Sequence, residues 1–188
     1  MNKLVSILLL CVSMQAGALE LKGVQVPDSA RVGDATLQLN GAGIRTKFFF
    51  KVYVGGLYLD KKTHDAATVL ANTGARRVAM YWLLGVGSKR IRDGFREGFD
   101  ANNTPAEITA LAPQLRQFLA IFDKFREVNE GDVFDLDYIP GEGLRASMNG
   151  KEMGRVAGAD FYRALLRVWF GRHAVDSDLE QGMLGSPD

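Results

Sequence analysis

Cysteine and histidine are scarce in this chain of 188 residues. There is one cysteine, Cys11, and there are two histidines, His64 and His173. A disulfide framework needs paired cysteines, and most zinc sites take their ligands from cysteine and histidine, so neither underlies this fold. The sequence also lacks a phosphate-binding loop, a GxSxG motif and an HExxH motif. We therefore expect no metal and no cofactor.

Net charge and long apolar runs are lacking as well. The chain carries 23 basic and 22 acidic residues, a formal net charge of +1. So small a net charge creates no long-range electrostatic field that would attract nucleic acid, and no basic run alternates with aromatics at a repeated spacing. Beyond the first residues, no segment offers the roughly 20 apolar residues of a membrane-spanning helix. With 47% hydrophobic and 24% charged residues, the composition predicts one globular domain with a single core.

The N-terminus has the three parts of a secretory signal peptide. Lys3 gives a positive start, Leu4–Val12 are apolar but too few to span a bilayer, and Ala16-Gly17-Ala18 are the small residues of a cleavage site. We predict a signal peptide over residues 1–18 and a single mature domain over residues 19–188. The protein would then be periplasmic or secreted.

A lipoprotein signal is the alternative use of Cys11. It requires a small residue immediately before the cysteine, and Leu10 is large. The sequence therefore favours a cleaved peptide over a lipid anchor.

The stretch Gly41–Asp60 is the segment around which we expect the fold to be organised. Alternation predicts a long strand with one apolar face, formed by Phe48, Phe50, Val52 and Val54, and one mixed face, formed by Phe49, Lys51 and Tyr53. Gly55-Gly56 would allow a bulge in this strand. Ala35–Asn40 would pair with it as a hairpin, across a bend at Gly41 and Gly43.

Other segments alternate between strand and helix patterns. Strands are predicted at Leu19–Val26, as an edge strand or lead-in, at Arg76–Leu84, and in a three-stranded meander over residues 133–156 that turns at Asn149-Gly150. Asp28–Asp34 is rich in turn residues. Helices are predicted at Asp65–Asn72, from Ser88 as a cap, from Thr104 with a division at Pro113, over Asp160–Phe170, and after Asp176 or Ser177. This order predicts an α+β fold, with helices on one face of a largely antiparallel sheet.

Two charge patterns are candidate functional signals. Asp135 and Asp137 share a strand face, where a solvated outer surface is favoured over a pair of catalytic acids. Lys89, Arg90 and Arg92 crowd the first turn of a helix, where the helix dipole disfavours cations. Asp93, Glu97 or a bound anion would offset these charges, and plain solvation is the favoured explanation.

Two motifs are distinctive. The first is Gly41-x-Gly43-x-Arg45 with the strand end Val54-Gly55-Gly56-Leu57-Tyr58-Leu59; the second is Trp169-Phe170-Gly171-x-x-Ala174-Val175-x-x-Asp178-Leu179. Together they resemble the chalcone isomerase superfamily. The chain most resembles the bacterial, signal-bearing chalcone isomerase-like proteins. The resemblance implies an open-faced β-sandwich, in which a large antiparallel sheet carries a helical layer on one face and a ligand cleft lies between them.

The resemblance also implies a set of site residues. In the plant enzymes an arginine, a threonine, a tyrosine, an asparagine and a second threonine surround a flavonoid; in related plant fatty-acid-binding members the arginine receives a carboxylate. The arginine matches Arg45 here. The other four positions fall at or near Tyr53, Gly87, Gly94 and Val168. Because glycine and valine offer no side-chain donor, this pocket is expected to bind rather than catalyse.

Two functions follow as hypotheses. The first is a periplasmic protein that binds a small amphipathic anion such as a fatty acid, with the carboxylate on Arg45. Its predicted ligand-binding residues are Arg45, Tyr53, Trp82, Ile91, Phe95, Val168 and Trp169. The second is an isomerase or intramolecular lyase acting on a chalcone-like or other enone substrate, with Arg45 and Tyr53 as its catalytic residues.

Each of these residues also has a structural alternative. Arg45 could pair with strand carbonyls or with an acid, and the aromatic residues could serve as plain core packing. Whether Arg45 and Tyr53 open on one cavity separates the ligand-binding role from the structural one. The sequence identifies no protein partner.

Overall fold

The computed structural model describes residues 18–185. Almost all of the predicted signal peptide, including Cys11, therefore lies outside the described residues. Within them, no helix combines the length and apolar character needed to cross a membrane.

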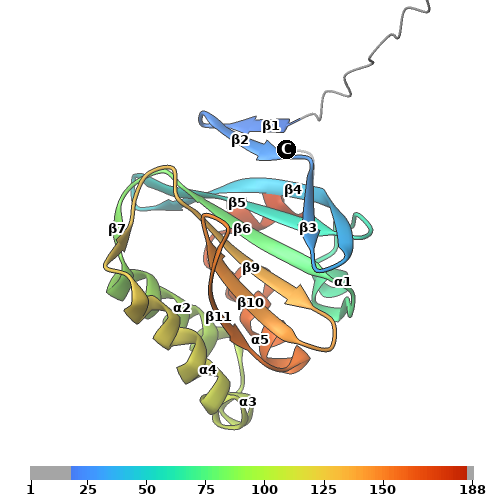
Figure 1. Cartoon of the computed structure of the whole chain (residues 1–188), viewed down its shortest axis with the longest axis vertical. Helices are drawn as coiled ribbons and strands as arrows, with labels where there is room; N and C mark the ends of the chain where they lie inside the picture. The colour runs from blue at the N-terminus through green and yellow to red at the C-terminus, as the bar shows by residue number, and fades with distance from the viewer. Residues whose placement is uncertain (1–17, 186–188) are drawn as a thin grey trace, which may run out of the picture.

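Seven antiparallel strands form one sheet, in the order β11-β10-β9-β6-β5-β4-β3 (Figure 1). They are β3 (Ser29–Val32), β4 (Ala35–Lys47), β5 (Phe50–Leu59), β6 (Arg76–Trp82), β9 (Val133–Ile139), β10 (Gly143–Met148) and β11 (Lys151–Val156). The predicted meander is confirmed. Its turn at Asn149-Gly150 has φ of 51° and 78°, the two positive values that a type I′ turn requires.

Four further strands form two separate ribbons. They are β1 (Ala18–Leu21), β2 (Val24–Pro27), β7 (Val86–Gly87) and β8 (Glu127–Val128). The predicted single strand Leu19–Val26 is thus a hairpin that turns at Lys22-Gly23, where both φ values are positive. The segment Asp28–Asp34, expected to be turns, instead contains β3. Pairing with β4 supplies the order that its own sequence does not indicate.

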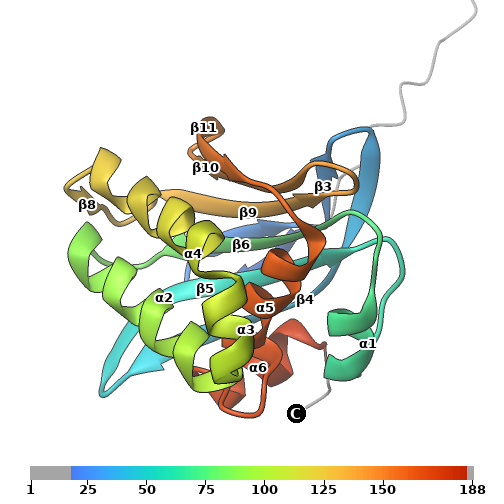
Figure 2. The ribbon, with the colours of Figure 1, turned by 90° about the horizontal axis from the view of Figure 1, so that it is seen from below.

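Helices are grouped on one side of the sheet (Figure 2). They are α1 (Ala66–Ala71), α2 (Ser88–Asn102), α3 (Pro105–Ala110), α4 (Ala112–Leu119), the 3₁₀ helix η1 (Ala120–Lys124), α5 (Ala159–Phe170) and α6 (Ser177–Met183). The capping box between Thr104 and Glu107 is confirmed, as is the division near Pro113, because α3 ends at Ala110 and α4 begins at Ala112. Ser88 is not the cap that the sequence suggested: Gly87 is the N-cap of α2, and Ser88 is its first helical residue.

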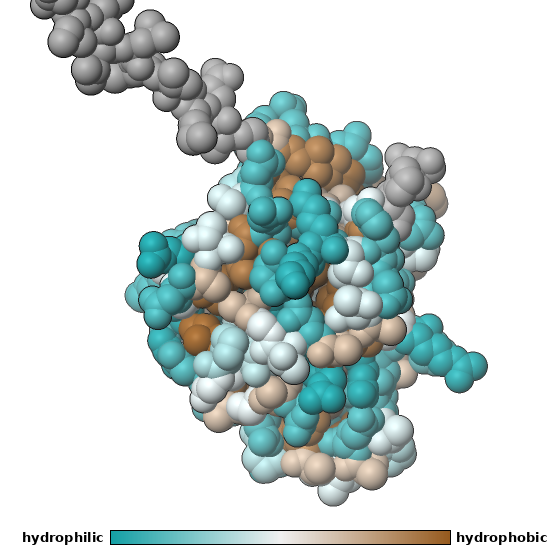
Figure 3. Space-filling view, turned by 90° about the vertical axis from the view of Figure 1, so that its right-hand side faces the viewer, coloured by the Kyte–Doolittle hydropathy of each residue, from teal (hydrophilic) through white to brown (hydrophobic). Residues whose placement is uncertain are grey.

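Both faces of the sheet are covered. The main core lies between the sheet and the helices, and includes Phe95, Phe99 and Trp169. A smaller hydrophobic cluster on the outer face includes Val26 and Val32. It is buried because the β1–β2 hairpin and a curled edge of the sheet fold over it. The curl brings Nη2 of Arg77, on β6, to 3.5 Å from the Arg31 carbonyl oxygen, on β3. On the side of the molecule shown in Figure 3, exposed hydrophobic residues form patches bordered by hydrophilic ones.

Gly41 and Gly43 do not form the predicted bend, because both lie inside β4. Their role is close packing against α6. A Cβ built on Gly43 would lie 2.7 Å from the Leu179 carbonyl oxygen, and one on Gly41 would lie 2.6 Å from the backbone nitrogen of Gly185. Only glycine permits this contact, which fixes α6 and the loop before it against β4.

The face assignment of the strand that begins near Phe48 was wrong. Phe48 and Phe49 form the hairpin turn, and β5 starts at Phe50. The predicted bulge at Gly55-Gly56 is absent from β5, whose pairing is continuous there. The register instead shifts near Val52, where Arg45 pairs with Tyr53 but Thr46 pairs with Lys51. This extra residue turns Tyr53 to the helical face, while Val54 packs on the outer face.

Asp135 and Asp137 do not lie on the solvated surface that the sequence suggested. Asp137 is 0% exposed, and it accepts hydrogen bonds from Nε and Nη2 of Arg77, at 2.5 and 2.9 Å, and from Nη2 of Arg145, at 2.8 Å. Asp135 lies 3.4 Å from Nη1 of Arg77 and is 13% exposed. The curled edge buries this outer face, so the aspartates form a buried ion-pair network.

Asp135 should make stability depend on pH. Burial raises the pKa of Asp135 to about 6, although Arg77 opposes the shift. Between about pH 4 and pH 6, the Asp135 carboxyl is therefore protonated in the folded state and ionised in the unfolded chain. Binding of this proton stabilises the fold below about pH 4, and the stabilisation is lost as pH rises through 6. The Asp135→Asn side chain cannot ionise, so the variant does not lose this contribution. Its free energy of unfolding, minus that of the wild type, should therefore rise by about 2 to 3 kcal/mol from pH 4 to pH 7. Urea unfolding at both pH values measures this difference, and a pH-independent difference would contradict it.

Candidate functional site

A row of three side chains crosses the sheet at one end of β4, β5 and β6. Arg45 is directly opposite Tyr53, and Tyr53 is directly opposite Trp82. Residues paired in this way project from the same face of an antiparallel sheet, so all three point toward the helices. The shift at Val52 is what aligns the row. The Tyr53 and Trp82 rings pack edge to face, with centroids 5.3 Å apart.

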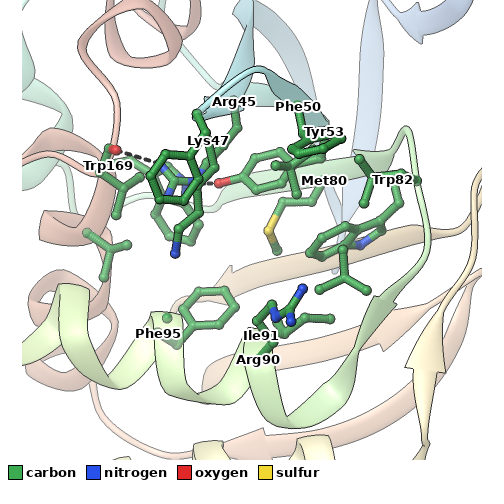
Figure 4. Close-up of a pocket in the computed structure, with 17 residues that line it drawn as sticks. Arg45, Lys47, Phe50, Tyr53, Met80, Trp82, Arg90, Ile91, Phe95 and Trp169 are labelled. Carbon is green, nitrogen blue, oxygen red and sulfur yellow. Dashed lines mark hydrogen bonds between the residues drawn. The ribbon is translucent and has the colours of Figure 1, made fainter.

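Between this row and the helices lies a cavity of about 800 Å³ that is partly open to solvent. That volume lies within the usual range of small-molecule sites. Helices α2 and α5 form the opposite wall with Ile91, Phe95, Val168 and Trp169 (Figure 4). The structure thus brings all seven predicted ligand-binding residues to one cavity. Their part in binding stays a prediction.

Tyr53 is tied into this wall. Its hydroxyl oxygen accepts a hydrogen bond of 3.0 Å from Nε1 of Trp169, and the side chain is buried. Burial raises the pKa of Tyr53, with Arg45 acting in the opposite direction. Tyr53 is therefore a neutral phenol whose own proton remains available to an acceptor in the cavity.

Arg45 is held by the segment that leads into α6. Its Nη1 donates to the carbonyl oxygen of Val175, and Asp176 accepts a hydrogen bond of 2.8 Å from the backbone nitrogen of Thr46. Among residues 18–185, no carboxylate lies within salt-bridge distance of Arg45. Part of the structural alternative for Arg45 is therefore real, since it binds a carbonyl. Arg45 also lines the cavity.

Trp82 contributes a further unused donor. Its indole Nε1 is buried and has no hydrogen-bond partner within the described chain. A buried donor without a partner is unfavourable unless a ligand or water satisfies it. The strand wall therefore offers the cavity donors from Arg45 and Tyr53, whereas Nε1 of Trp82 is covered by the protein itself.

Additional cations stand at the edge of the cavity. Lys47 and Arg90 line it, and both also line an adjoining hollow of about 520 Å³ that includes Gly87 and Gly94. The other cations of the α2 first turn are paired: Lys89 with Asp93 at 2.6 Å, and Arg92 with Asp123 at 2.9 Å. An acid thus offsets each of them, whereas Arg90 is exposed beside the cavity.

Sequence reasoning missed several cavity residues, namely Lys47, Phe48, Phe50, Val52, Met80, Leu84, Val86, Arg90 and Val175. Phe50 and Val52 share the face of Tyr53 only because of the register shift. Met80 alternates with Trp82 on β6, so spacing from a predicted lining residue could have found it.

The comparisons with known proteins agree with this geometry. The chalcone isomerase-like family model matches residues 18–185. A crystal structure of a fatty-acid binding protein from Arabidopsis thaliana has a similar fold, with a TM-score of 0.64. It is 18% identical in sequence, and the match covers 86% of this chain and 92% of that one. A search of curated proteins gives no match.

The structure has the features that the resemblance implied: a curved seven-stranded antiparallel sheet, a helical layer, and Arg45 in the cavity between them. The family match spans every described residue. The chain belongs to the chalcone isomerase-like family.

Proposed function

We propose that this protein binds a small amphipathic anion such as a fatty acid, with its carboxylate on Arg45 and its apolar tail along the α2–α5 wall. The observation that carries the proposal is the guanidinium fork of Arg45, which lacks a carboxylate partner in the described chain and lines an otherwise largely apolar cavity. A planar fork can donate two parallel hydrogen bonds to a carboxylate. The similar fold of a plant fatty-acid binding protein supports the same ligand class.

Tyr53 would serve as a second donor to the carboxylate. Its raised pKa keeps the phenol protonated, and its oxygen already accepts from Trp169, so its own proton is directed to another acceptor. The tail would contact Ile91, Phe95 and Val168 on the helices. Burial of a long alkyl chain supplies most of the affinity, and the donors fix its orientation.

Binding is favoured over catalysis by what surrounds Arg45. Gly94 and Val168 line the cavity where the resemblance places the asparagine and second threonine of the plant enzymes. Neither residue can donate a side-chain hydrogen bond to a developing enolate. A Tyr53 with a raised pKa is also a poor base at neutral pH.

A titration of acid against ester tests the proposal. Hexadecanoate, dodecanoate and methyl hexadecanoate are titrated calorimetrically into the chain beginning at Leu19. The two acids should bind, and the ester should bind at least tenfold more weakly than hexadecanoate, because it cannot accept the two charge-assisted hydrogen bonds. Equal affinities for hexadecanoate and its ester would overturn the role of Arg45, and no binding of either acid would overturn the proposal.

Gly94→Trp should block the cavity without unfolding the protein. A Cβ built on Gly94 meets nothing within 4 Å, and this position borders both the cavity and the adjoining hollow. An indole there would occupy space that the ligand needs, while replacing a helical glycine with tryptophan gains about 0.5 kcal/mol in helix propensity. We expect affinity for hexadecanoate to fall at least tenfold, with a melting temperature equal to or above that of the wild type.

Gly94→Ala is the matched control for this variant. It shares the gain in helix propensity but adds only one methyl group, so it should keep its affinity. Tryptophan and alanine variants that bind equally well would place the ligand elsewhere.

We further propose that the protein is exported to the periplasm or secreted. The support is the sequence of residues 1–18, with its charged start, apolar centre and Ala16-Gly17-Ala18 site. Intact-mass analysis of the protein from the periplasmic fraction should show a chain that starts at Leu19. A full-length chain in the cytoplasm would contradict export, and a lipid-modified chain starting at Cys11 would contradict the cleavage site.

A further inference from the structure

Three consecutive phenylalanines form the end of the β4–β5 hairpin. Phe48, Phe49 and Phe50 are 83%, 96% and 66% exposed, whereas Leu19, the other large exposed hydrophobic residue of the described chain, is 41% exposed. The hairpin projects beyond the neighbouring strands beside α2 (Figure 2). A cluster of exposed apolar side chains marks an interaction site more often than a surface without a function.

The backbone of this turn does not favour phenylalanine. Lys47 pairs with Phe50, so Phe48 and Phe49 are the two central residues, and Phe48 has a φ of 57°. A positive φ at the first central residue alone is the pattern of a type II′ turn, where glycine is preferred. A bulky side chain resists this left-handed conformation. Folding of the hairpin therefore gives no reason for Phe48, which points to a role outside the fold.

Cations surround the phenylalanines. Lys47 and Lys51 flank them in sequence, and Lys22, in the β1–β2 turn, lies close enough to lower the pKa of Lys51. Arg90 stands nearby on α2, across the cavity entrance. Within residues 18–185, none of these four cations has a salt-bridge partner. The tip is apolar and bordered by unpaired positive charge. A complementary partner is therefore apolar inside and anionic at its surface.

We propose that this tip, residues Lys47–Lys51, inserts into an anionic lipid bilayer. The phenylalanine rings enter the boundary between headgroups and acyl chains, and the surrounding cations contact lipid phosphates. A second copy of this chain is disfavoured as the occupant, because two tips would bring like charges together.

Membrane insertion would place the cavity entrance at the lipid surface. Lys47, Phe48 and Phe50 belong to the tip and also line the cavity. If the proposed function holds, an amphipathic ligand could then pass between bilayer and cavity with its tail shielded from water. Insertion itself requires only the tip, so the two proposals are separable by experiment.

Vesicle co-sedimentation of the chain beginning at Leu19 tests the inference. Vesicles of phosphatidylglycerol with phosphatidylethanolamine are compared with vesicles of phosphatidylcholine alone. The informative substitutions are Phe49→Ser and Lys51→Gln, because neither residue lines the cavity. We expect the wild type to partition onto anionic vesicles, Phe49→Ser to reduce partitioning about tenfold and Lys51→Gln about fivefold. Hexadecanoate affinity measured without vesicles should stay unchanged in both variants.

The matched control is Lys61→Gln, an exposed lysine beyond the opposite end of β5, which should partition like the wild type. A wild type that ignores anionic vesicles, or a Phe49→Ser variant that partitions equally well, would overturn the inference. Sedimentation velocity covers the alternative occupant: self-association abolished by Phe49→Ser, without vesicle binding, would assign the tip to a second copy. Failure of ligand binding alone would leave the vesicle result intact.

Discussion

Replacing Asp137 with alanine is expected to lower the free energy of unfolding by about 3 kcal/mol or more. Asp137 is fully buried and accepts three hydrogen bonds from Arg77 and Arg145, whose side chains are 18% and 27% exposed. Removing the carboxylate leaves two guanidinium groups beside each other with little access to water. Breaking a buried pair from one side is therefore far more destabilising than losing a surface pair.

Asp123→Ala is the surface control for this prediction. Asp123 also bonds an arginine, Arg92, at 2.9 Å, but it is 63% exposed. Its loss should change the unfolding free energy by less than about 1 kcal/mol. Urea denaturation of both variants at pH 7 measures the contrast, and equal effects would mean that the curled edge does not bury Asp137 in solution.

Replacing Arg45 with alanine is expected to weaken hexadecanoate binding by about 2 to 5 kcal/mol. Much of this loss is the penalty of leaving a buried carboxylate without a partner. Arg45→Lys should restore only part of the affinity, because an ammonium group cannot hold the Val175 carbonyl and present a planar fork to the ligand at the same time. Calorimetric titration of the three proteins measures these differences.

Arg90→Ala is the control for charge at the same cavity. Arg90 lines the cavity from α2 but is solvent-exposed, so its loss should change affinity by less than about 1 kcal/mol. Thermal unfolding of each variant separates binding from folding. An Arg45→Ala protein that is unfolded at room temperature would return Arg45 to a structural role through Val175.

Much of the fold was predictable from local patterns in the sequence. The helical spacing of Ile91, Phe95 and Phe99 and the capping box at Thr104 report interactions within a few residues, so they were predictable without a structure. The same holds for the Asn149-Gly150 turn. These local signals and the family resemblance together placed seven residues on one cavity.

The features that sequence reasoning missed depend on contacts between distant segments. Gly41 and Gly43 looked like a bend because nothing local shows that α6 packs on them. Asp137 looked solvated because the covering edge strand, β3, lies about a hundred residues earlier in the chain. The register shift at Val52 arises from pairing with β4, and it decides which side chains face the cavity.

The same long-range packing joins the two motifs that resembled the family. Gly43 of the first motif packs on Leu179 of the second, and Arg45 donates to Val175. The glycines thus permit close packing and not a turn: they let α6 approach β4 closely enough for the loop before it to orient the guanidinium. A Cβ at Gly43 would displace Leu179 and with it the support of Arg45.

The most direct test of the ligand-binding account is a crystal structure with 16-bromohexadecanoate, whose bromine marks the tail by anomalous scattering. The account predicts a ligand carboxylate within about 3 Å of the Arg45 guanidinium, and bromine inside the cavity near Ile91, Phe95 or Val168. Bromine outside the cavity, or a carboxylate that contacts only Lys47 and Arg90 while Arg45 binds only the Val175 carbonyl, would contradict it.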